Sequence, residues 1–164
     1  MRSPAPRVVQ VTVADEADLV RLAGAVAALL PPRTFVALHG DLGAGKTTFV
    51  KAVAAALGID PTEVVSPTFG LIHEHVGPHG RLVHGDMYRL SAPTDLAETG
   101  WHDAVAGAAC VLLEWPERVA AALPDERIDV TITIDGPTAR TFAFVGHGAS
   151  AARVVDALGG PDAR

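Results

Sequence analysis

The fold of this chain is decided by the stretch Gly40-Asp41-Leu42-Gly43-Ala44-Gly45-Lys46-Thr47. It fits the pattern G-x-x-x-x-G-K-T, whose spacing is fixed. Residues 34–38, just before it, form an apolar, β-prone run typical of a strand buried on both faces. After Lys46, apolar residues recur at helical spacing up to Leu57, and Gly58 is placed as a C-terminal cap. Strand, glycine-rich loop and helix is the context that a phosphate-binding loop requires.

The chemistry of such a loop follows from its backbone. Gly43 and Gly45 let successive N–H groups turn toward phosphate oxygens, and the N-terminus of the following helix adds a partial positive charge. Lys46 would reach the β and γ phosphates, and the Thr47 hydroxyl would ligate Mg²⁺. The alternative is an ordinary glycine turn before a helix. The loop predicts ATP and Mg²⁺ as cofactors, contacted by Asp41, Leu42, Gly43, Ala44, Gly45, Lys46, Thr47 and Thr48.

An acid for the metal is predicted further along the chain. Residues 109–113 form a short, wholly apolar run that ends in Glu114, which is typical of an interior strand with an acid at its carboxyl end. A bound triphosphate needs its magnesium oriented, usually by such an acid. Glu114 is therefore predicted as a metal ligand, in a Walker-B-like strand end with Glu in place of the commoner Asp. The alternative is that this acid caps a helix or is solvated.

Two further polar groups are candidates for catalysis beside Lys46. Asp86 ends another predicted strand, and the carboxyl ends of strands in α/β proteins form the crevice where ligands bind. Asp86 could position water or support the metal, but an ion pair with Arg89 or a turn hydrogen bond is an equally good interpretation. Thr68, in Ser66-Pro67-Thr68, also has two interpretations, because such a hydroxyl could sense a γ-phosphate or simply form a turn.

The remaining sequence predicts an α/β fold. Strands are predicted at 8–13, 68–75, 81–88, 128–134 and 140–145, helices between Asp15 and Pro31 and at 151–158, and a helix or a broken pair of turns at 94–105. Residues 128–134 alternate strictly between apolar and polar side chains and precede a turn at 135–137, which predicts an antiparallel hairpin packed on one face. We expect a P-loop NTPase-like fold with a mixed, mainly parallel sheet flanked by helices and this hairpin at its C-terminal end.

Length and composition indicate the number of domains and the cellular location. With 164 residues, of which 49% are hydrophobic, the chain can fill one core, so we predict a single domain over residues 1–164 with a disordered tail at 158–164. Its single cysteine, Cys110, cannot form an intramolecular disulfide, and residues 1–6 do not resemble a signal peptide. No apolar run approaches the ~20 residues that span a bilayer. We expect a soluble cytoplasmic protein.

Charge and histidine content argue against two other kinds of site. The formal net charge is −6 and the 13 Lys and Arg residues are scattered, whereas binding to a nucleic-acid backbone rewards clustered cations. Any nucleic-acid role is therefore expected to run through a partner. Seven histidines occur, but without cysteine partners or an H-E-x-x-H helix they do not support a zinc site.

Four motifs in a fixed order give the chain a family resemblance. They are G-D-L-G-A-G-K-T-T-F at 40–49, S-P-T-F at 66–69, H-x-D-x-Y-R-L at 84–90 and L-E-W-P at 113–116. Across about residues 10–145 they resemble the TsaE (YjeE) family, bacterial ATPases needed for threonylcarbamoylation of the adenosine next to the anticodon in certain tRNAs. The resemblance implies an α/β P-loop fold in which Lys46 and Thr47 hold the triphosphate and its Mg²⁺, and Glu114 completes the metal site.

The same resemblance implies further roles and partners. Asp86 and Thr68 take the family's suspected roles in hydrolysis and in a switch-like loop, and Trp115 matches a tryptophan close to the nucleotide. Glu16 and Arg140 are implied as weaker nucleotide contacts. The implied partners are the proteins TsaD, which transfers the threonylcarbamoyl group, and TsaB. ATP binding or hydrolysis by this chain would reset the complex of TsaD with TsaB. Contact with tRNA would be indirect, and this chain would not itself catalyse the transfer.

Two departures from the family pattern stand out. Gly85 replaces the bulky aromatic residue usual before the aspartate, and Trp101-His102 stands where a smaller aliphatic residue usually follows glycine. We expect the first departure to loosen the strand packing under Asp86 and the second to alter a partner surface. Neither departure lies in the phosphate-binding loop.

Three functions compete on this sequence. A partner-coupled ATPase leads; a P-loop kinase of small molecules and a nucleotide-binding scaffold without turnover are the alternatives. A kinase lid ordinarily carries several arginines, but only Arg81 and Arg89 lie between Gly58 and Glu114. The N-K-x-D element of a GTPase does not occur. A scaffold has no physical requirement for a lysine, a hydroxyl and two acids that together suit one Mg-triphosphate.

Overall fold

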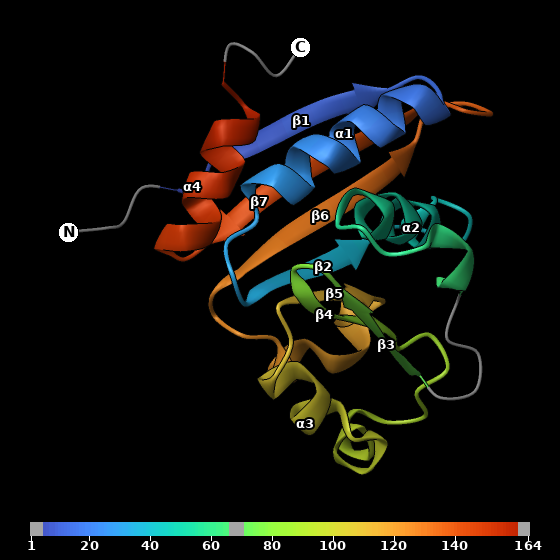
Figure 1. Ribbon diagram of the computed structural model, residues 1–164, viewed down its shortest axis with the longest axis vertical. Coiled ribbons are helices and arrows are strands. Elements are labelled where there is room, and N and C mark those ends of the chain that lie inside the picture. Colours follow the sequence, from blue (N-terminus) through green and yellow to red (C-terminus); the bar gives the residue numbers. More distant parts are fainter. Residues whose placement is uncertain (1–4, 66–70, 161–164) are drawn as a thin grey trace.

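The computed structural model describes residues 5–65 and 71–160 (Figure 1). Within them the chain forms one seven-stranded sheet in the order β1-β7-β6-β2-β5-β4-β3. The strands are β1 Val8–Val13, β2 Thr34–His39, β3 Ile72–Gly77, β4 Gly80–Asp86, β5 Cys110–Glu114, β6 Arg127–Ile134 and β7 Arg140–His147. The helices are α1 Glu16–Leu29, α2 Lys46–Ala56, α3 Trp101–Ala106 and α4 Ala149–Leu158, with 3₁₀ helices η1 Pro61–Glu63, η2 Pro93–Thr99 and η3 Pro116–Ala122.

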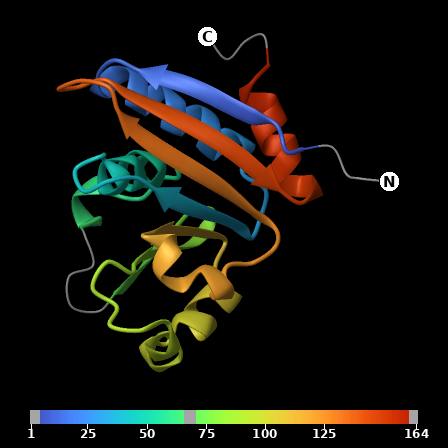
Figure 2. The same ribbon diagram turned by 180° about the vertical axis from the view of Figure 1, so that it is seen from behind.

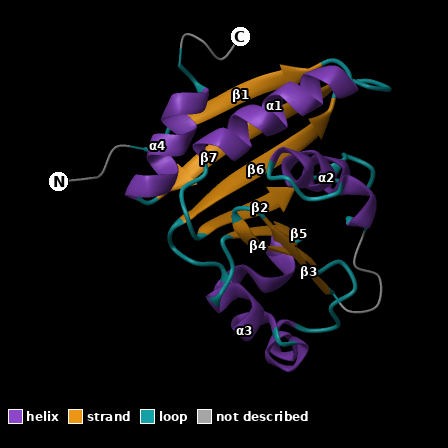
Figure 3. Cartoon of the chain, viewed as in Figure 1, coloured by secondary structure: helices purple, strands orange, loops and turns teal. Residues whose placement is uncertain are grey.

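The sheet is mixed, as predicted, and its parallel part is central. β2 pairs in parallel with β5 and β6, and β4 pairs in parallel with β5. The outer pairs β3–β4, β6–β7 and β1–β7 are antiparallel, and β6–β7 is the predicted C-terminal hairpin (Figure 3). In the parallel part Leu38 and Asp86 both stand in register with Glu114. The carboxyl ends of these strands therefore meet at one edge of the sheet.

The two faces of the sheet are covered differently. Helices α1, α2 and α4 lie on one face, where they share a hydrophobic cluster with β1, β2, β4, β5, β6 and β7. On the other face α3, η2 and η3 pack against β2, β4 and β5, and Ile72 of β3 packs against the same cluster. From behind, β1, β7 and β6 lie open in front of the helices (Figure 2). Strands covered on both faces read as continuous apolar runs, and strands covered on one face alternate, which is how the sequence distinguished them.

Local sequence signals fix the helix ends near the loop. The Asp15 carboxylate accepts a hydrogen bond from the Asp18 N–H at 2.9 Å and so caps α1 as predicted. α2 begins at Lys46, directly after Gly45. The ambiguous stretch 94–105 is a broken pair, since Gly100 with φ +81° separates η2 from α3.

Several predicted bounds differ slightly from the structure. β3 begins at Ile72, and residues 66–70, which include part of the predicted strand 68–75, lie outside the described residues. The predicted tail at 158–164 starts one residue too early, because Leu158 is a buried residue of α4, and residues 161–164 lie outside the described residues. β4 ends at Asp86 rather than at Tyr88, because the Tyr88 N–H turns back to the Asp86 carboxylate. Among the described residues, no helix is both long and apolar enough to cross a membrane.

Gly85 and Trp101 meet in the core, so the expected loosening at Gly85 and the expected surface position of Trp101 are wrong, whereas the neighbouring His102 is exposed. A Cβ placed on Gly85 would lie 2.6 Å from a ring atom of Trp101 and 3.0 Å from Leu113 Cδ1. The Trp101 side chain is only 2% exposed and meets Phe35 edge-on. The indole fills the room that the missing side chain leaves, so the packing beside Asp86 is not loosened and Trp101 is no surface residue.

Candidate nucleotide-binding site

The glycine-rich loop connects the end of β2 to the start of α2. Gly43 and Gly45 have φ values of +83° and +101°, a region that side chains with a Cβ rarely adopt. These two turns bring the chain directly into the N-terminal turn of α2, whose first N–H groups lack partners within the helix. The loop therefore presents backbone donors and a helix N-terminus to one place, as an anion site requires.

Lys46 is held inside this loop by the loop itself. Its side chain is buried, and Nζ donates to the carbonyl oxygens of Gly40 at 2.5 Å and Asp41 at 3.0 Å. The ammonium also lies 4.2 Å from the ring centroid of Trp115. Burial lowers the pKa of Lys46, while the carboxylates of Glu114, Glu117 and Asp86 act to raise it. A cation is thus fixed beside the loop N–H groups.

Glu114 lies directly behind the loop and contacts it. The Thr47 hydroxyl donates to the two carboxylate oxygens at 3.0 and 2.9 Å. Glu114 is 3% exposed and η3 is capped by Trp115, so the alternatives of a solvated end or a helix cap are wrong. Because the hydroxyl proton is directed to the carboxylate, the lone pairs of Thr47 Oγ1 are the groups that a cation would contact. Hydroxyl and carboxylate oxygens are the ligands that Mg²⁺ prefers, so these residues fit that ion.

Asp86 lies on the neighbouring strand end, in register with Glu114. Its Oδ1 accepts a hydrogen bond from the Tyr88 N–H at 3.0 Å, so the predicted turn bond and the predicted place in the crevice both occur. Burial raises the pKa of Asp86, and the nearby Glu114 carboxylate adds to this, although the Tyr88 hydrogen bond opposes it. Among the described residues, Asp86 forms no ion pair with Arg89.

A cavity of about 330 Å³ joins these groups. It is lined by Leu42, Gly43, Gly45, Lys46, Thr47, Thr48, Asp86, Tyr88, Glu114 and Trp115. One wall is aromatic, because the rings of Tyr88 and Trp115 lie 5.0 Å apart and Arg118 lies 5.9 Å from the Tyr88 ring. Both acids, Trp115 and the predicted loop residues other than Asp41 and Ala44 therefore surround one space.

A second cavity of about 340 Å³ continues along the loop and shares Gly43, Gly45 and Thr48 with the first. Its wall includes the apolar side chains of Val13, Leu19 and Phe142, and Ala44, Glu16 and Arg140 also line it. Arg140 Nε donates to the Ala44 carbonyl at 3.0 Å, and Nη1 donates to two carbonyls of the hairpin turn at 2.8 Å. Arg140 thus ties the β6–β7 hairpin to the loop. Contacts of Glu16 and Arg140 with a nucleotide stay a prediction.

Thr68 lies outside the described residues, so its role also stays a prediction.

Sequence reasoning missed His84. It is fully buried, and its Nε2 lies 2.5 Å from Glu114 Oε2. The signal that could have found it is its place two residues before Asp86, which puts both side chains on one face of β4.

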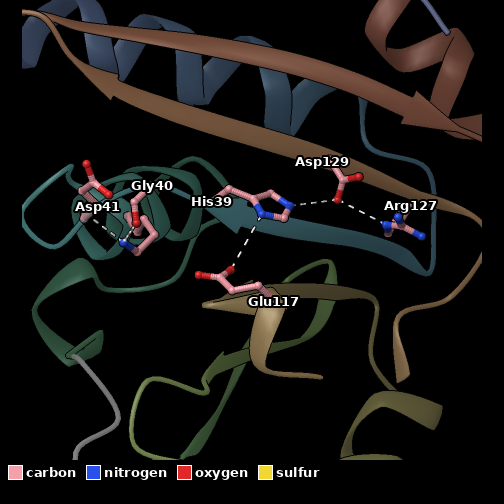
Figure 4. A network of polar contacts seen from close by, with 7 residues as sticks. His39, Gly40, Asp41, Glu117, Arg127 and Asp129 are labelled. Atoms are coloured by element: carbon pink, nitrogen blue, oxygen red, sulfur yellow. Dashed lines mark hydrogen bonds and ion pairs between the residues drawn. The ribbon is translucent and has the colours of Figure 1, made fainter. Parts of the chain in front are cut away.

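Sequence reasoning also missed a polar network behind the loop (Figure 4). Asp129 Oδ1 accepts from Arg127 Nε at 3.2 Å and lies 3.2 Å from His39 Nε2, while His147 Nε2 lies 2.7 Å from Oδ2. Burial raises the pKa of Asp129, but hydrogen bonds from His39 and Arg127 outweigh it and bring the pKa to about 2. Since His39 directly precedes Gly40, the network anchors the strand end from which the loop starts.

Among the described residues, no group of three or more His, Cys, Asp or Glu side chains is arranged to hold a metal ion. The oxygen pair at Thr47 and Glu114 is a different kind of site. Mg²⁺ is commonly held by one or two carboxylate or hydroxyl groups together with substrate phosphates, rather than by a cage of protein ligands.

Comparison with known proteins bears on the family and the fold of the chain. A family model described as "Threonylcarbamoyl adenosine biosynthesis protein TsaE" matches residues 13–142. The chain is 35% identical to the Rickettsia bellii tRNA threonylcarbamoyladenosine biosynthesis protein TsaE, over 76% of this chain and 86% of that one. It is 40% identical to the Treponema pallidum protein of that name, over 71% and 85%. The crystal structure of Bacillus subtilis YdiB superposes with a TM-score of 0.76 at 27% identity, covering 95% and 97% of the two chains.

The fold is that of a P-loop NTPase-like α/β protein, with a mixed sheet whose central strands end at the glycine-rich loop and its acids. The chain belongs to the TsaE family, whose role is in tRNA threonylcarbamoyladenosine biosynthesis.

Proposed function

We propose that this protein is a Mg²⁺-dependent ATPase that serves threonylcarbamoylation of the adenosine next to the tRNA anticodon by resetting a complex of TsaD and TsaB. The observation that carries the proposal is the hydrogen bond from the Thr47 hydroxyl to Glu114, immediately behind the loop that holds Lys46. In P-loop NTPases a hydroxyl of the loop and an acid at a neighbouring strand end hold the Mg²⁺ of the bound triphosphate.

In this proposal the loop binds and orients the phosphates. The N–H groups after Gly43 and at the N-terminus of α2 donate hydrogen bonds to the phosphate oxygens. Lys46 exchanges its contacts with the Gly40 and Asp41 carbonyls for contacts with phosphate oxygens. Thr47 and Glu114 hold Mg²⁺, which when bound neutralises charge that develops on the phosphate oxygens. Asp86 orients the attacking water, and Thr68 responds to the γ-phosphate.

The nucleoside occupies the second cavity, beside the apolar side chains of Val13, Leu19 and Phe142. Glu16 and Arg140 lie at its wall and contact the nucleoside, and Trp115 closes the phosphate side. The proposal places the protein in the cytoplasm, and its contact with tRNA is indirect, because its net charge of −6 does not suit a nucleic-acid backbone.

The first test is a calorimetric titration with ATP and Mg²⁺ of the wild type, Lys46→Ala and the matched control Lys51→Ala. Lys51 is an exposed lysine on the same helix, so its removal should leave affinity unchanged. We expect Lys46→Ala to weaken binding by about 100-fold or more, because it removes a buried cation from the phosphate site. Equal affinity in Lys46→Ala and the wild type would refute the nucleotide site.

The second test measures ATP hydrolysis by the purified protein, alone and with TsaD plus TsaB. Weak turnover that rises with the partners and disappears in Lys46→Ala would support the proposal. Binding without any partner response would leave the nucleotide site in place and favour the kinase or scaffold alternatives. A survey of phosphoryl acceptors would then separate those two.

A further inference from the structure

A fully buried histidine lies behind the metal-binding acid. His84 is 0% exposed and stands in β4 between the buried apolar residues Leu82, Val83 and Met87. Among the described residues, its Nδ1 has no hydrogen-bond partner. A leucine or valine would fill such a core position without burying a polar nitrogen, which is costly when it is not paired. Packing alone therefore gives no reason for a histidine here.

The reason lies across the sheet, on the neighbouring strand. β4 and β5 run in parallel with His84 opposite Leu112 and Asp86 opposite Glu114, so His84 and Glu114 share one face, two positions apart. The imidazole spans this offset, and its Nε2 lies 2.5 Å from Glu114 Oε2. Since a carboxylate accepts hydrogen bonds and Nδ1 has no proton acceptor to serve, the network assigns the ring proton to Nε2.

Two residues from different elements contact the Glu114 carboxylate, and both reach its Oε2. Thr47 Oγ1 donates to it from the loop, and His84 Nε2 donates from the core. Without the second contact the carboxylate could rotate away from Thr47. With it, the orientation that meets the loop hydroxyl is set before any nucleotide arrives.

We propose that His84 is a positioning residue for the magnesium site, which orients the Glu114 carboxylate toward Thr47 through its Nε2–H. This inference rests on the proposed function, since it concerns the same site. Groups that hydrogen-bond to metal ligands typically change metal affinity by about 10–100-fold when they are removed. His84 should therefore control how strongly Mg²⁺ assists nucleotide binding rather than nucleotide binding itself.

The test uses two variants that keep a polar side chain in the core. In His84→Gln the amide nitrogen takes the place of Nε2 and can still donate to Glu114, whereas in His84→Asn the amide ends at the position of Nδ1 and falls short. The variant Val83→Ala, on the adjacent and opposite-facing position, is the control for a general loss of packing. Thermal unfolding of each variant establishes that it is folded under the conditions of the titration.

The measurement is the calorimetric Kd for a non-hydrolysable ATP analogue, once with a chelator and once with excess Mg²⁺. The quantity compared is the Kd with chelator divided by the Kd with Mg²⁺. We expect His84→Asn to lower this ratio by about 10-fold, with the metal-free Kd within twofold of wild type, while His84→Gln and Val83→Ala keep the wild-type ratio. A role in packing alone would not separate Gln from Asn in this way.

Two results would overturn the inference in distinguishable ways. If His84→Asn keeps the wild-type ratio, or loses affinity equally with and without Mg²⁺, His84 does not position the acid, while the proposed function stands. If the wild type itself binds the analogue equally well with and without Mg²⁺, the proposed metal site fails and the inference falls with it.

Discussion

The two halves of the sheet make different use of the same kind of strand. In the parallel part, β2, β5 and β4 are covered on both faces, and their carboxyl ends carry the loop and both acids. In the antiparallel part, β6, β7 and β1 are covered by helices on one face, while Thr131 and Thr133 lie exposed on the other. The comparison teaches that the chemistry lies where strands are most deeply packed, because a rigid frame fixes the positions of functional side chains.

The largest expected effect lies in the parallel part, at the contact of Trp101 with Gly85. Trp101→Ala should lower the free energy of unfolding by about 3–5 kcal/mol, because it leaves a cavity beside the sheet. Gly85→Phe should be strongly destabilising alone, where the indole already occupies the space, and much less so combined with Trp101→Ala. Urea unfolding of both single variants and the double variant gives the coupling free energy, which we expect to be about 1–3 kcal/mol.

Gly24→Ala is the matched control for that experiment, since a Cβ there would meet nothing within 4 Å in the middle of α1. It should stabilise the protein by about 0.5–1 kcal/mol. Additive effects of the Trp101 and Gly85 substitutions would contradict the proposed compensation.

The next effect lies at the end of the same strands. Glu114→Ala should reduce Mg²⁺-dependent ATP hydrolysis on the order of 100-fold, because it removes the proposed Mg²⁺ ligand and the acceptor of the Thr47 hydroxyl. Rates measured across a Mg²⁺ series test this, with the exposed Glu98→Ala as control. An unchanged magnesium profile in the variant would show that Glu114 is not the metal acid.

A smaller effect is expected in the antiparallel part, at Asp129 on β6. Its pKa is lowered from 3.8 to about 2 in the folded protein, so its carboxylate stabilises the fold above about pH 4 and loses this contribution as the pH falls toward 2. The stability advantage of wild type over Asp129→Asn should therefore shrink by about 2 kcal/mol across that window. Urea unfolding at several pH values measures it, with the exposed Asp125→Asn as reference. A constant difference between wild type and Asp129→Asn would count against the network.

The smallest effect is expected at Arg140 on β7. Arg140→Ala should weaken ATP binding by about 10-fold, because the Ala44 carbonyl loses a charged donor and the loop loses its tie to the hairpin. Arg140→Lys should recover little of the lost affinity. The planar guanidinium donates to three carbonyls, and a lysine ammonium lacks this geometry. Calorimetry checks this against Arg153→Ala, an exposed arginine on α4. Full affinity in Arg140→Ala would mean that the hairpin does not support the loop.

Much of the fold and part of the site could be predicted because their signals are local. The loop pattern with its flanking strand and helix predicted the start of α2 correctly, and period-two alternation predicted the β6–β7 hairpin. Glu114 could be proposed because an acid after an apolar run marks a strand end. Asp86 kept two interpretations. The predicted turn hydrogen bond occurs and Asp86 lines the cavity, while its role in positioning water or supporting the metal stays a prediction.

The sequence by itself determined the glycine-rich loop between β2 and α2, the α/β class and the family, because backbone conformation and periodicity act over neighbouring residues. Only the tertiary structure decided that His84 reaches Glu114, that Trp101 fills the space beside Gly85, and that Asp129 joins His39. Each of these contacts joins distant parts of the chain. Strand order and register bring them together, and a shift of one residue in β4 or β6 would turn His84 or Asp129 to the opposite face of the sheet.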